Sequence, residues 1–255
     1  MPPVILFVVD GLRPDAVSPQ ATPVLASLMA SGRYTLSART VMPSVTLPCH
    51  MSLFHSVDPG RHGVTTNTWT PQVRPVPGLF DLARQAGLKA AAFYNWEELR
   101  DLWRPGAVET ACYWHDNKTP DGDGVIAAAA AVRLASEAYD LAFIYLGHTD
   151  SAGHRDGWLS PYYAAAVANA DACIGQVLSA LPEGWTALVV ADHGGHERSH
   201  GTEAPEDMTI PLIMAGQGIA PAALDGQASI LDVAPTIAAL QGLSTPDEWE
   251  GRSLL

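Results

Sequence analysis

The chain has 255 residues, of which 47% are hydrophobic and 16% charged, a composition typical of a folded soluble protein and not of an extensively disordered one. This length accommodates one large domain or two small ones, and we expect a single α/β domain. The formal net charge of -13 disfavours nucleic-acid polymers as partners unless bound cations supply local positive charge.

The cysteines and the N-terminus indicate the compartment. Cys49, Cys112 and Cys173 are widely spaced and form no CxxC pair, which predicts neither a disulfide framework nor a thiolate zinc site. The N-terminus runs directly into an apolar segment without a basic leader, and no apolar run is long enough to span a membrane. We therefore expect a cytoplasmic protein with no membrane partner, and the sequence leaves the oligomeric state open.

Short apolar strands alternate with helical patterns along the chain. The first strand, residues 4–9, ends at Asp10, and a helix with Thr22 as its N-cap follows and ends at Gly32. Another helix is predicted to begin near Thr46, where unpaired backbone N–H groups and the helix dipole favour an anion. The other predictions are a turn at 58–63, helices at 79–86, 125–139, 161–181 and 230–240, and strands at 88–94, 141–146, 187–191 and 208–215.

This alternation predicts a doubly wound, mostly parallel central sheet with helices on both faces. Residues 97–124 interrupt the pattern, because aromatic side chains stand there among acids, prolines and glycines. We expect this segment to form a small cap-like excursion over one face of the sheet instead of a domain.

Potential metal ligands lie just past the carboxyl ends of three predicted strands, at Asp10, Asp150, His154, Asp192 and His193. Carboxylates and imidazoles bind zinc, manganese and iron, and neighbouring glycines let the backbone fold tightly around such a site. Taken alone, the segment 187–200 is equally compatible with a polar surface loop after a strand. Ligands bind beyond the carboxyl ends of strands in doubly wound sheets, so the convergence of three such ends favours a metal site.

Six motifs that follow one another along the chain resemble the alkaline phosphatase superfamily, and within it the type I phosphodiesterase/nucleotide pyrophosphatase branch. They are FVVDGLR at 7–13, MPSVTLPCH at 42–50, DPGRHGV at 58–64 with Asn67, DSAGH at 150–154, ADHG at 191–194 and HG at 200–201. A single DHG motif is weak evidence, whereas six ordered motifs extend over most of the chain. The resemblance implies that residues 1–255 form one alkaline phosphatase-like catalytic domain.

The resemblance also implies two divalent metal ions, with zinc expected first and manganese or iron as alternatives. The ligands of one ion would be Asp150, His154 and His200. The ligands of the other would be Asp10, Asp192 and His193, together with the hydroxyl oxygen of Thr46. His196 is a rival to His200, but glycine follows His200 as it does in the family motif.

Two residues would carry the chemistry in this family. Thr46 would attack the substrate phosphorus to give a phosphothreonine intermediate, which water then hydrolyses. Asn67 would donate a hydrogen bond to a phosphate oxygen beside the Thr46 backbone N–H. Without the resemblance, an N-cap would be the commonest role for a threonine at this position.

Three further residues are candidates for a substrate pocket. Cys49 stands where many relatives have asparagine, and as a small buried residue it is expected to be inert. Trp69 would contribute to an aromatic wall, although core packing is the commoner role of a tryptophan. His196 is expected in the pocket or exposed. The substrate would be a small phosphorylated molecule, a nucleotide or another phosphodiester.

The leading prediction is therefore a hydrolase of phosphodiester or phosphoanhydride bonds. A phosphomonoesterase is the nearest alternative, but the arginine that clamps a terminal phosphate in alkaline phosphatases does not follow Thr46. Phosphonate hydrolases also use threonine, and a metal-binding protein without turnover is a more remote alternative. Sulfatases need a CxPxR-like motif that is absent here, and cofactor-independent phosphoglycerate mutases use serine and a large inserted domain.

Overall fold

The structure is a computed structural model that describes residues 1–224 and 227–255. Its centre is an eight-stranded sheet in the order β4-β3-β5-β1-β6-β7-β2-β8. β1 (Val4–Val9) pairs in parallel with β5 (Leu141–Leu146) on one side and with β6 (Thr186–Val190) on the other. Every residue of these three strands is buried, as in parallel strands that are covered on both faces.

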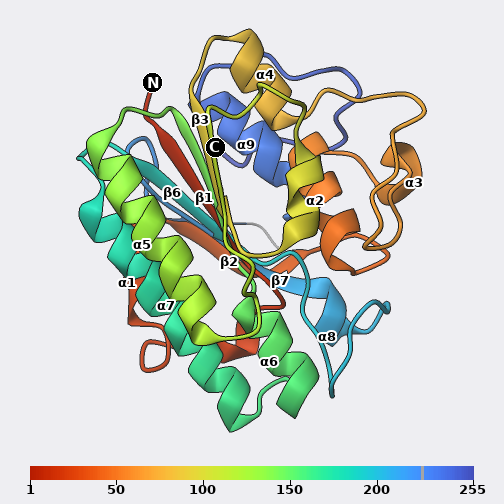
Figure 1. Cartoon of the computed structure of the whole chain (residues 1–255), viewed down its shortest axis with the longest axis vertical. Coiled ribbons are helices and arrows are strands. Elements are labelled where there is room, and N and C mark those ends of the chain that lie inside the picture. The colour runs from red at the N-terminus through yellow and green to blue at the C-terminus, as the bar shows by residue number, and fades with distance from the viewer. Residues whose placement is uncertain (225–226) are drawn as a thin grey trace.

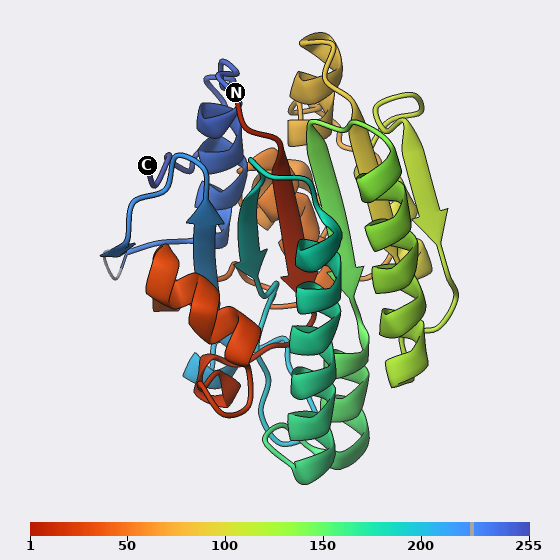
Figure 2. The ribbon, with the colours of Figure 1, turned by 90° about the vertical axis from the view of Figure 1, so that its left-hand side faces the viewer.

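The outer strands extend the sheet in both directions. β3 (Ala90–Tyr94) and β4 (Thr110–Tyr113) continue the parallel arrangement beyond β5. β7 (Thr209–Gly216) runs antiparallel to β6 and to β2 (Arg33–Arg39), and Figure 2 shows it pointing opposite to β1. The short β8 (Ala222–Ala223) pairs in parallel with β2. The prediction of a mostly parallel sheet is therefore confirmed.

Helices cover both faces of this sheet, as the doubly wound prediction requires (Figures 1 and 2). One face carries α1 (Pro23–Ser31), α5 (Pro120–Ser136) and α7 (Pro161–Ala180), and the other carries α2 (Thr46–His55), α4 (Leu79–Gln85) and α9 (Val233–Leu240). Shorter helices complete the chain: η1 (Pro14–Ala16), α3 (Pro59–His62), η2 (Glu97–Leu102), α6 (His148–Asp156), α8 (Pro205–Met208) and η3 (Ile230–Asp232). In the part of the chain that the structure describes, no helix is both long and apolar enough to cross a membrane.

Several elements differ from the sequence pattern for physical reasons. The pattern does not predict β2, because its polar and arginine residues hide the strand signal, and pairing with β7 forms it. A short helix, α3, replaces the turn expected at 58–63. Thr22 occupies the N-cap position of α1, but its hydroxyl bonds to Ser18. The capping oxygens come from Asp171 on α7, which accepts the first free N–H groups of α1.

The segment 97–124 contributes to the sheet and to a helix. It contains η2, the edge strand β4 and the first turn of α5, so part of it lies in the sheet and not over one face. The helix at 125–139 begins earlier than predicted because Pro120 suits its first position and Asp121 places negative charge in its first turn. A cap-like role for the rest of the segment stays a prediction.

Candidate metal centre

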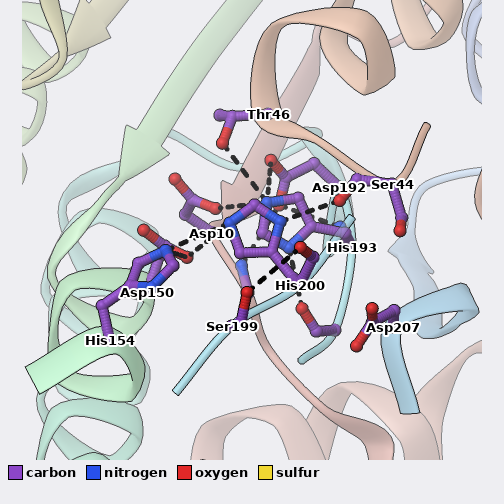
Figure 3. Close-up of polar contacts among 12 residues, drawn as sticks. Asp10, Ser44, Thr46, Asp150, His154, Asp192, His193, Ser199, His200 and Asp207 are labelled. Atoms are coloured by element: carbon purple, nitrogen blue, oxygen red, sulfur yellow. Dashed lines mark hydrogen bonds and ion pairs between the residues drawn. The ribbon is translucent and has the colours of Figure 1, made fainter. Parts of the chain in front are cut away.

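The predicted ligands gather at one edge of the sheet, where β1, β5 and β6 end (Figure 3). Asp10 follows β1, and Asp192 and His193 follow β6 after a single residue. β5 leads into α6, a helix that the sequence pattern does not predict because its residues are almost all polar. α6 places Asp150 and His154 four residues apart, so both side chains lie on the same face.

A fully buried group contains Asp10, Asp192 and His193, each of which offers a ligand atom within 4.8 Å of the others. His193 Nε2 lies 3.3 Å from Asp10 Oδ1 and 3.5 Å from Asp192 Oδ2. Among the residues that the structure describes, none donates a hydrogen bond to either of these carboxylate oxygens. A buried charged oxygen without a partner is costly, and one cation between the three side chains would satisfy both oxygens.

The other oxygen of each carboxylate is held by the protein. The Tyr145 hydroxyl donates to Asp10 Oδ2. The backbone N–H groups of Gly11 and His193 donate to Asp192 Oδ1 at 3.2 and 3.0 Å. Because one oxygen is fixed, the other is directed into the space between the ligand candidates, as in metal-binding carboxylates.

A second group, Asp150, His154 and His200, lies against the first and is partly open to solvent. Asp150 Oδ1 lies 3.4 Å from His154 Nε2 and 3.5 Å from His200 Nε2, and it too has no donor within residues 1–224 and 227–255. The rings of His193 and His200 stack with centroids 3.8 Å apart, which brings the two groups together.

All three histidines present the same nitrogen to the centre. Each Nδ1 lies within 2.9 Å of a backbone carbonyl oxygen, and because that oxygen only accepts, Nδ1 carries the proton and Nε2 keeps its lone pair. The carbonyls belong to Gly194 for His193, Arg198 for His154 and Ser44 for His200. Burial lowers the pKa of His193 and of His200 to about 4, so both rings are neutral at pH 7.

Burial shifts the pKa values of the three carboxylates in the opposite direction, upward. Burial raises the pKa of Asp10 well above its ordinary value, and the negative charges of Asp192 and Asp150 raise it further. Burial is also the largest cause of the raised pKa of Asp150 and of Asp192. Three acids with inward-facing oxygens, beside three imidazoles whose Nε2 atoms face them, fit two divalent cations, and this mixed N/O donor set suits zinc, manganese or iron.

Thr46 is the first residue of α2, and Val45 is its N-cap, so the hydroxyl is not used for capping. Thr46 Oγ1 lies 3.2 Å from His193 Nε2, beside the buried ligand group. Asn67 Oδ1 accepts the Leu47 N–H at 3.0 Å, which leaves its amide N–H₂ free to donate at the same helix end. The structure thus brings Thr46 and Asn67 together where the helix dipole favours an anion.

The comparison with known proteins decides the family. The family model described as Type I phosphodiesterase / nucleotide pyrophosphatase matches residues 4–208, which is most of the chain. The chain belongs to this family. The family is metal-dependent, in agreement with the two groups of candidate ligands.

Two curated proteins are similar in sequence to parts of this phosphodiesterase-family chain. Ectonucleotide pyrophosphatase/phosphodiesterase family member 1 of Homo sapiens is 24% identical over 223 residues, which are 78% of this chain and 24% of the relative. A 2,3-bisphosphoglycerate-independent phosphoglycerate mutase of Methanosarcina acetivorans is 32% identical over 130 residues, 48% of this chain and 24% of the relative. The chain therefore spans about a quarter of the length of these curated relatives.

Solved structures share the fold at low sequence identity. An inactive variant of murine ectonucleotide pyrophosphatase/phosphodiesterase 5 in complex with AMP has a TM-score of 0.80 at 14% identity, and the match covers 96% of both chains. The phosphonate monoester hydrolase of Agrobacterium radiobacter has a TM-score of 0.80 at 15% identity, with coverage of 100% of this chain and 76% of that one. A 2-O glycosaminoglycan sulfatase, BT1596, gives 0.80 at 17% identity, covering 99% and 73%. These matches establish an alkaline phosphatase-like fold.

The three residues predicted for a substrate pocket, Cys49, Trp69 and His196, lie in three different places in the fold. Cys49 is fully buried and Thr40 Oγ1 donates to its sulfur at 3.2 Å, so its side chain does not reach the surface. Trp69 is 39% exposed and lines a cavity of about 450 Å³ that none of the ligand candidates lines. His196 is partly exposed and its Nδ1 lies 2.7 Å from Asp207, which raises the pKa of His196.

Sequence reasoning missed two buried neighbours of the ligands. Tyr145 belongs to an apolar strand, and its only signal is a hydroxyl that needs a partner when it is buried. His50 lies fully buried with Nδ1 2.8 Å from the Thr46 carbonyl oxygen and 3.5 Å from Asp192 Oδ2. Both residues therefore touch the centre from inside the core.

Asp123 holds the beginning of α6 in place. Its Oδ1 accepts from Asn95 Nδ2 at 2.8 Å and from the backbone N–H groups of Gly147 and His148 at 3.1 and 3.3 Å. Because α6 carries two of the ligand candidates, this carboxylate links the end of β3 to the metal centre. Burial raises the pKa of Asp123 to about 7, although these hydrogen bonds lower it.

We expect Asp123→Asn to become progressively less destabilising, relative to the unmutated protein, as pH rises from 5 to 9. The folded pKa of Asp123 lies above its unfolded value, so the stability linked to its proton is present at low pH and lost as pH rises through about 7. The whole shift, from 3.8 to about 7, corresponds to about 4 kcal/mol, of which about 3 kcal/mol falls between pH 5 and pH 9. Urea unfolding at each pH would measure it, and a difference independent of pH would contradict the raised pKa.

Proposed function

We propose that this chain is a metal-dependent hydrolase that cleaves phosphodiester or phosphoanhydride bonds, with residues 1–255 as one catalytic domain. The observation that carries this proposal is the position of the Thr46 hydroxyl. It lies at the positive end of α2 and 3.2 Å from a histidine of the buried ligand group. The inactive murine relative bound to AMP, a threonine-to-alanine variant, supports the same role for threonine.

In the proposed reaction, the Thr46 oxygen forms a bond to phosphorus and gives up its proton to solvent. The bond from phosphorus to the leaving oxygen breaks, and that oxygen takes up a proton from water. A water oxygen then attacks the phosphothreonine, and the restored Thr46 hydroxyl and the phosphate product separate. Bound divalent cations would supply positive charge that stabilises the attacking and leaving oxygens and lowers the pKa of the hydroxyl.

Asn67 and the first backbone N–H groups of α2 would bind the non-bridging phosphate oxygens. We expect Asn67→Ala to lower kcat/KM about a hundredfold, because a preorganised donor to the transition state is lost. Thr68→Ala in the same exposed loop is the matched control and should leave the rate unchanged. Steady-state kinetics with both variants would test this, and an equal loss in both would assign the effect to the loop instead of to the amide.

The proposed substrate is a small phosphorylated molecule, a nucleotide or another phosphodiester. The relative crystallised with AMP supports a nucleotide, and the net charge of -13 disfavours a nucleic-acid polymer. The cavity lined by Trp69 and Trp103 would accommodate an aromatic group of such a substrate. Zinc as the metal and a cytoplasmic location stay predictions from the sequence.

The deciding experiment compares three chromogenic substrates with metal analysis of the same sample. Bis(p-nitrophenyl) phosphate represents diesters, p-nitrophenyl phosphate represents monoesters, and p-nitrophenyl phenylphosphonate represents phosphonates. We expect the diester to give the highest kcat/KM. A strong preference for the monoester or the phosphonate would replace the proposed bond specificity, and bound metal without turnover of any substrate would indicate a metal-binding protein.

A further inference from the structure

Trp158 lies where three glycines meet: Gly11 and Gly153 of two metal-binding motifs, and Gly195, which directly follows a third. A Cβ atom at Gly153 would stand 2.6 Å from its ring, one at Gly195 would stand 2.2 Å away, and one at Gly11 would stand 3.3 Å away. Distances under 3.0 Å leave no room for a side chain. The backbone at these glycines therefore packs directly against the indole, and any larger residue at Gly153 or Gly195 would displace the ring.

The indole ring contacts both histidines of the partly open ligand group. Its centroid lies 5.2 Å from that of His154, with the planes at 81°, and 5.9 Å from that of His200, with the planes at 68°. The side chain of His154 is 45% exposed; its Nδ1 bonds to the Arg198 carbonyl and its Nε2 lies 3.1 Å from His200 Nε2. These contacts lie along the edge of a half-exposed imidazole, so a packing neighbour is needed to fix the orientation of the ring.

Trp158 is itself held by the segments that carry the ligands. Its Nε1–H donates to the Gly11 carbonyl at 2.9 Å, and its backbone N–H donates to the Glu197 carbonyl at 2.8 Å. The next residue, Leu159, has a φ of 65°, in the left-handed region that a leucine rarely adopts. Such a strained backbone persists only where surrounding contacts determine it.

We propose that Trp158 is a positioning residue that fixes the rings of His154 and His200 so that their Nε2 atoms face one cation. This inference rests on the metal sites of the proposed function. The buried group has a different support, because Tyr145, Gly11 and backbone N–H groups hold its carboxylates. The Gly11 carbonyl would also keep its bond from the Tyr163 hydroxyl, at 2.9 Å, after the indole N–H is lost.

The test measures zinc affinity in two single-site backgrounds. Asp192→Asn leaves the partly open group, and Asp150→Asn leaves the buried one. We expect Trp158→Phe to weaken Zn²⁺ binding at least about tenfold in the first background. In the second background the change should be less than about twofold, because Tyr145 and backbone N–H groups hold the carboxylates of the buried group. Competition titration with a chromogenic chelator gives both constants without any activity measurement.

Trp249→Phe is the matched control, because Trp249 is equally buried and its Nε1–H donates to the Pro77 carbonyl at 2.9 Å. It should lower the melting temperature as Trp158→Phe does and leave both zinc constants unchanged. If Trp158→Phe does not fold, Gly153→Ala displaces the indole by steric overlap with its new Cβ atom and should give the same selective loss.

The two possible failures are distinguishable. Equal weakening in both backgrounds, or no weakening in the Asp192→Asn background, would overturn the role of Trp158 and leave the metal sites intact. An unmutated chain that binds no Zn²⁺ would overturn the metal sites, and the role of Trp158 with them.

Discussion

Replacing Thr46 with alanine is expected to lower kcat/KM for the diester at least about a thousandfold while the metal content stays unchanged. The hydroxyl is the proposed nucleophile, whereas three other side chains remain to hold the adjacent cation. The hydroxyl is not an N-cap, since Val45 occupies that position, so its removal should cost little stability. Initial rates, metal analysis and a melting curve on the same sample would separate these effects.

Thr46→Ser is the matched control, because it keeps a hydroxyl at the same place and should retain much of the rate. With ³²P-labelled substrate and rapid acid quenching, the unmutated protein should retain label on Thr46, and the alanine variant should retain none. Substantial turnover by the alanine variant would show that water attacks phosphorus directly.

The fold follows from the sequence where local pattern and tertiary environment agree. β1, β5 and β6 are almost entirely apolar because they are buried on both faces, and their alternation with helical segments indicates a central parallel sheet. β2 and α6 are hidden from such reasoning. β2 gains its structure from pairing with β7, and α6 is a polar helix whose inner face points at the ligand centre.

The metal ligands of the candidate site can be predicted from the sequence, whereas the residues that orient them cannot. Ligand positions such as Asp10 and Asp192 are readable because they follow strands whose carboxyl ends must lie together. The residues that orient these ligands cannot be predicted from the sequence, because Tyr145 lies 135 residues from its partner Asp10 and Trp158 lies 147 residues from its partner Gly11. Spacing within a motif therefore identifies the ligands, and only the folded chain identifies the residues that orient them.

The centre is electrostatically unfavourable without cations. Asp10 and Asp192 are buried and Asp150 is partly buried beside them, and burial together with the charges of the other two carboxylates raises the pKa of Asp10 well above its ordinary value. His193 and His200, which are neutral at pH 7, relieve this repulsion only weakly. The arrangement therefore lowers the free energy of unfolding of the metal-free protein, and bound cations would raise it again.

Asp10→Asn is therefore expected to change stability in opposite directions with and without metal. In the metal-loaded protein it removes a ligand, so bound metal, activity and the melting temperature should all fall, with about 2.7 kcal/mol of linked stability lost at a metal concentration of a hundred Kd. In the metal-free protein it removes a repelling charge while Tyr145 keeps an oxygen to donate to. The melting temperature should then rise, by about 2 to 4 °C for each kcal/mol gained.

The rise in the metal-free protein has a defined pH dependence. The folded pKa of Asp10 exceeds its unfolded value, so the stability linked to its proton is present in acid and lost as pH rises. The advantage of Asp10→Asn should accordingly be small near pH 4 and grow toward pH 8. Asp171→Asn is the control, because this buried carboxylate caps α1 through the Val24 and Leu25 N–H groups. The variant should change the melting temperature by the same amount with zinc and with chelator. A lower melting temperature for Asp10→Asn in both conditions at pH 8 would mean that its carboxylate stabilises the fold without a cation, contrary to the electrostatics of the site.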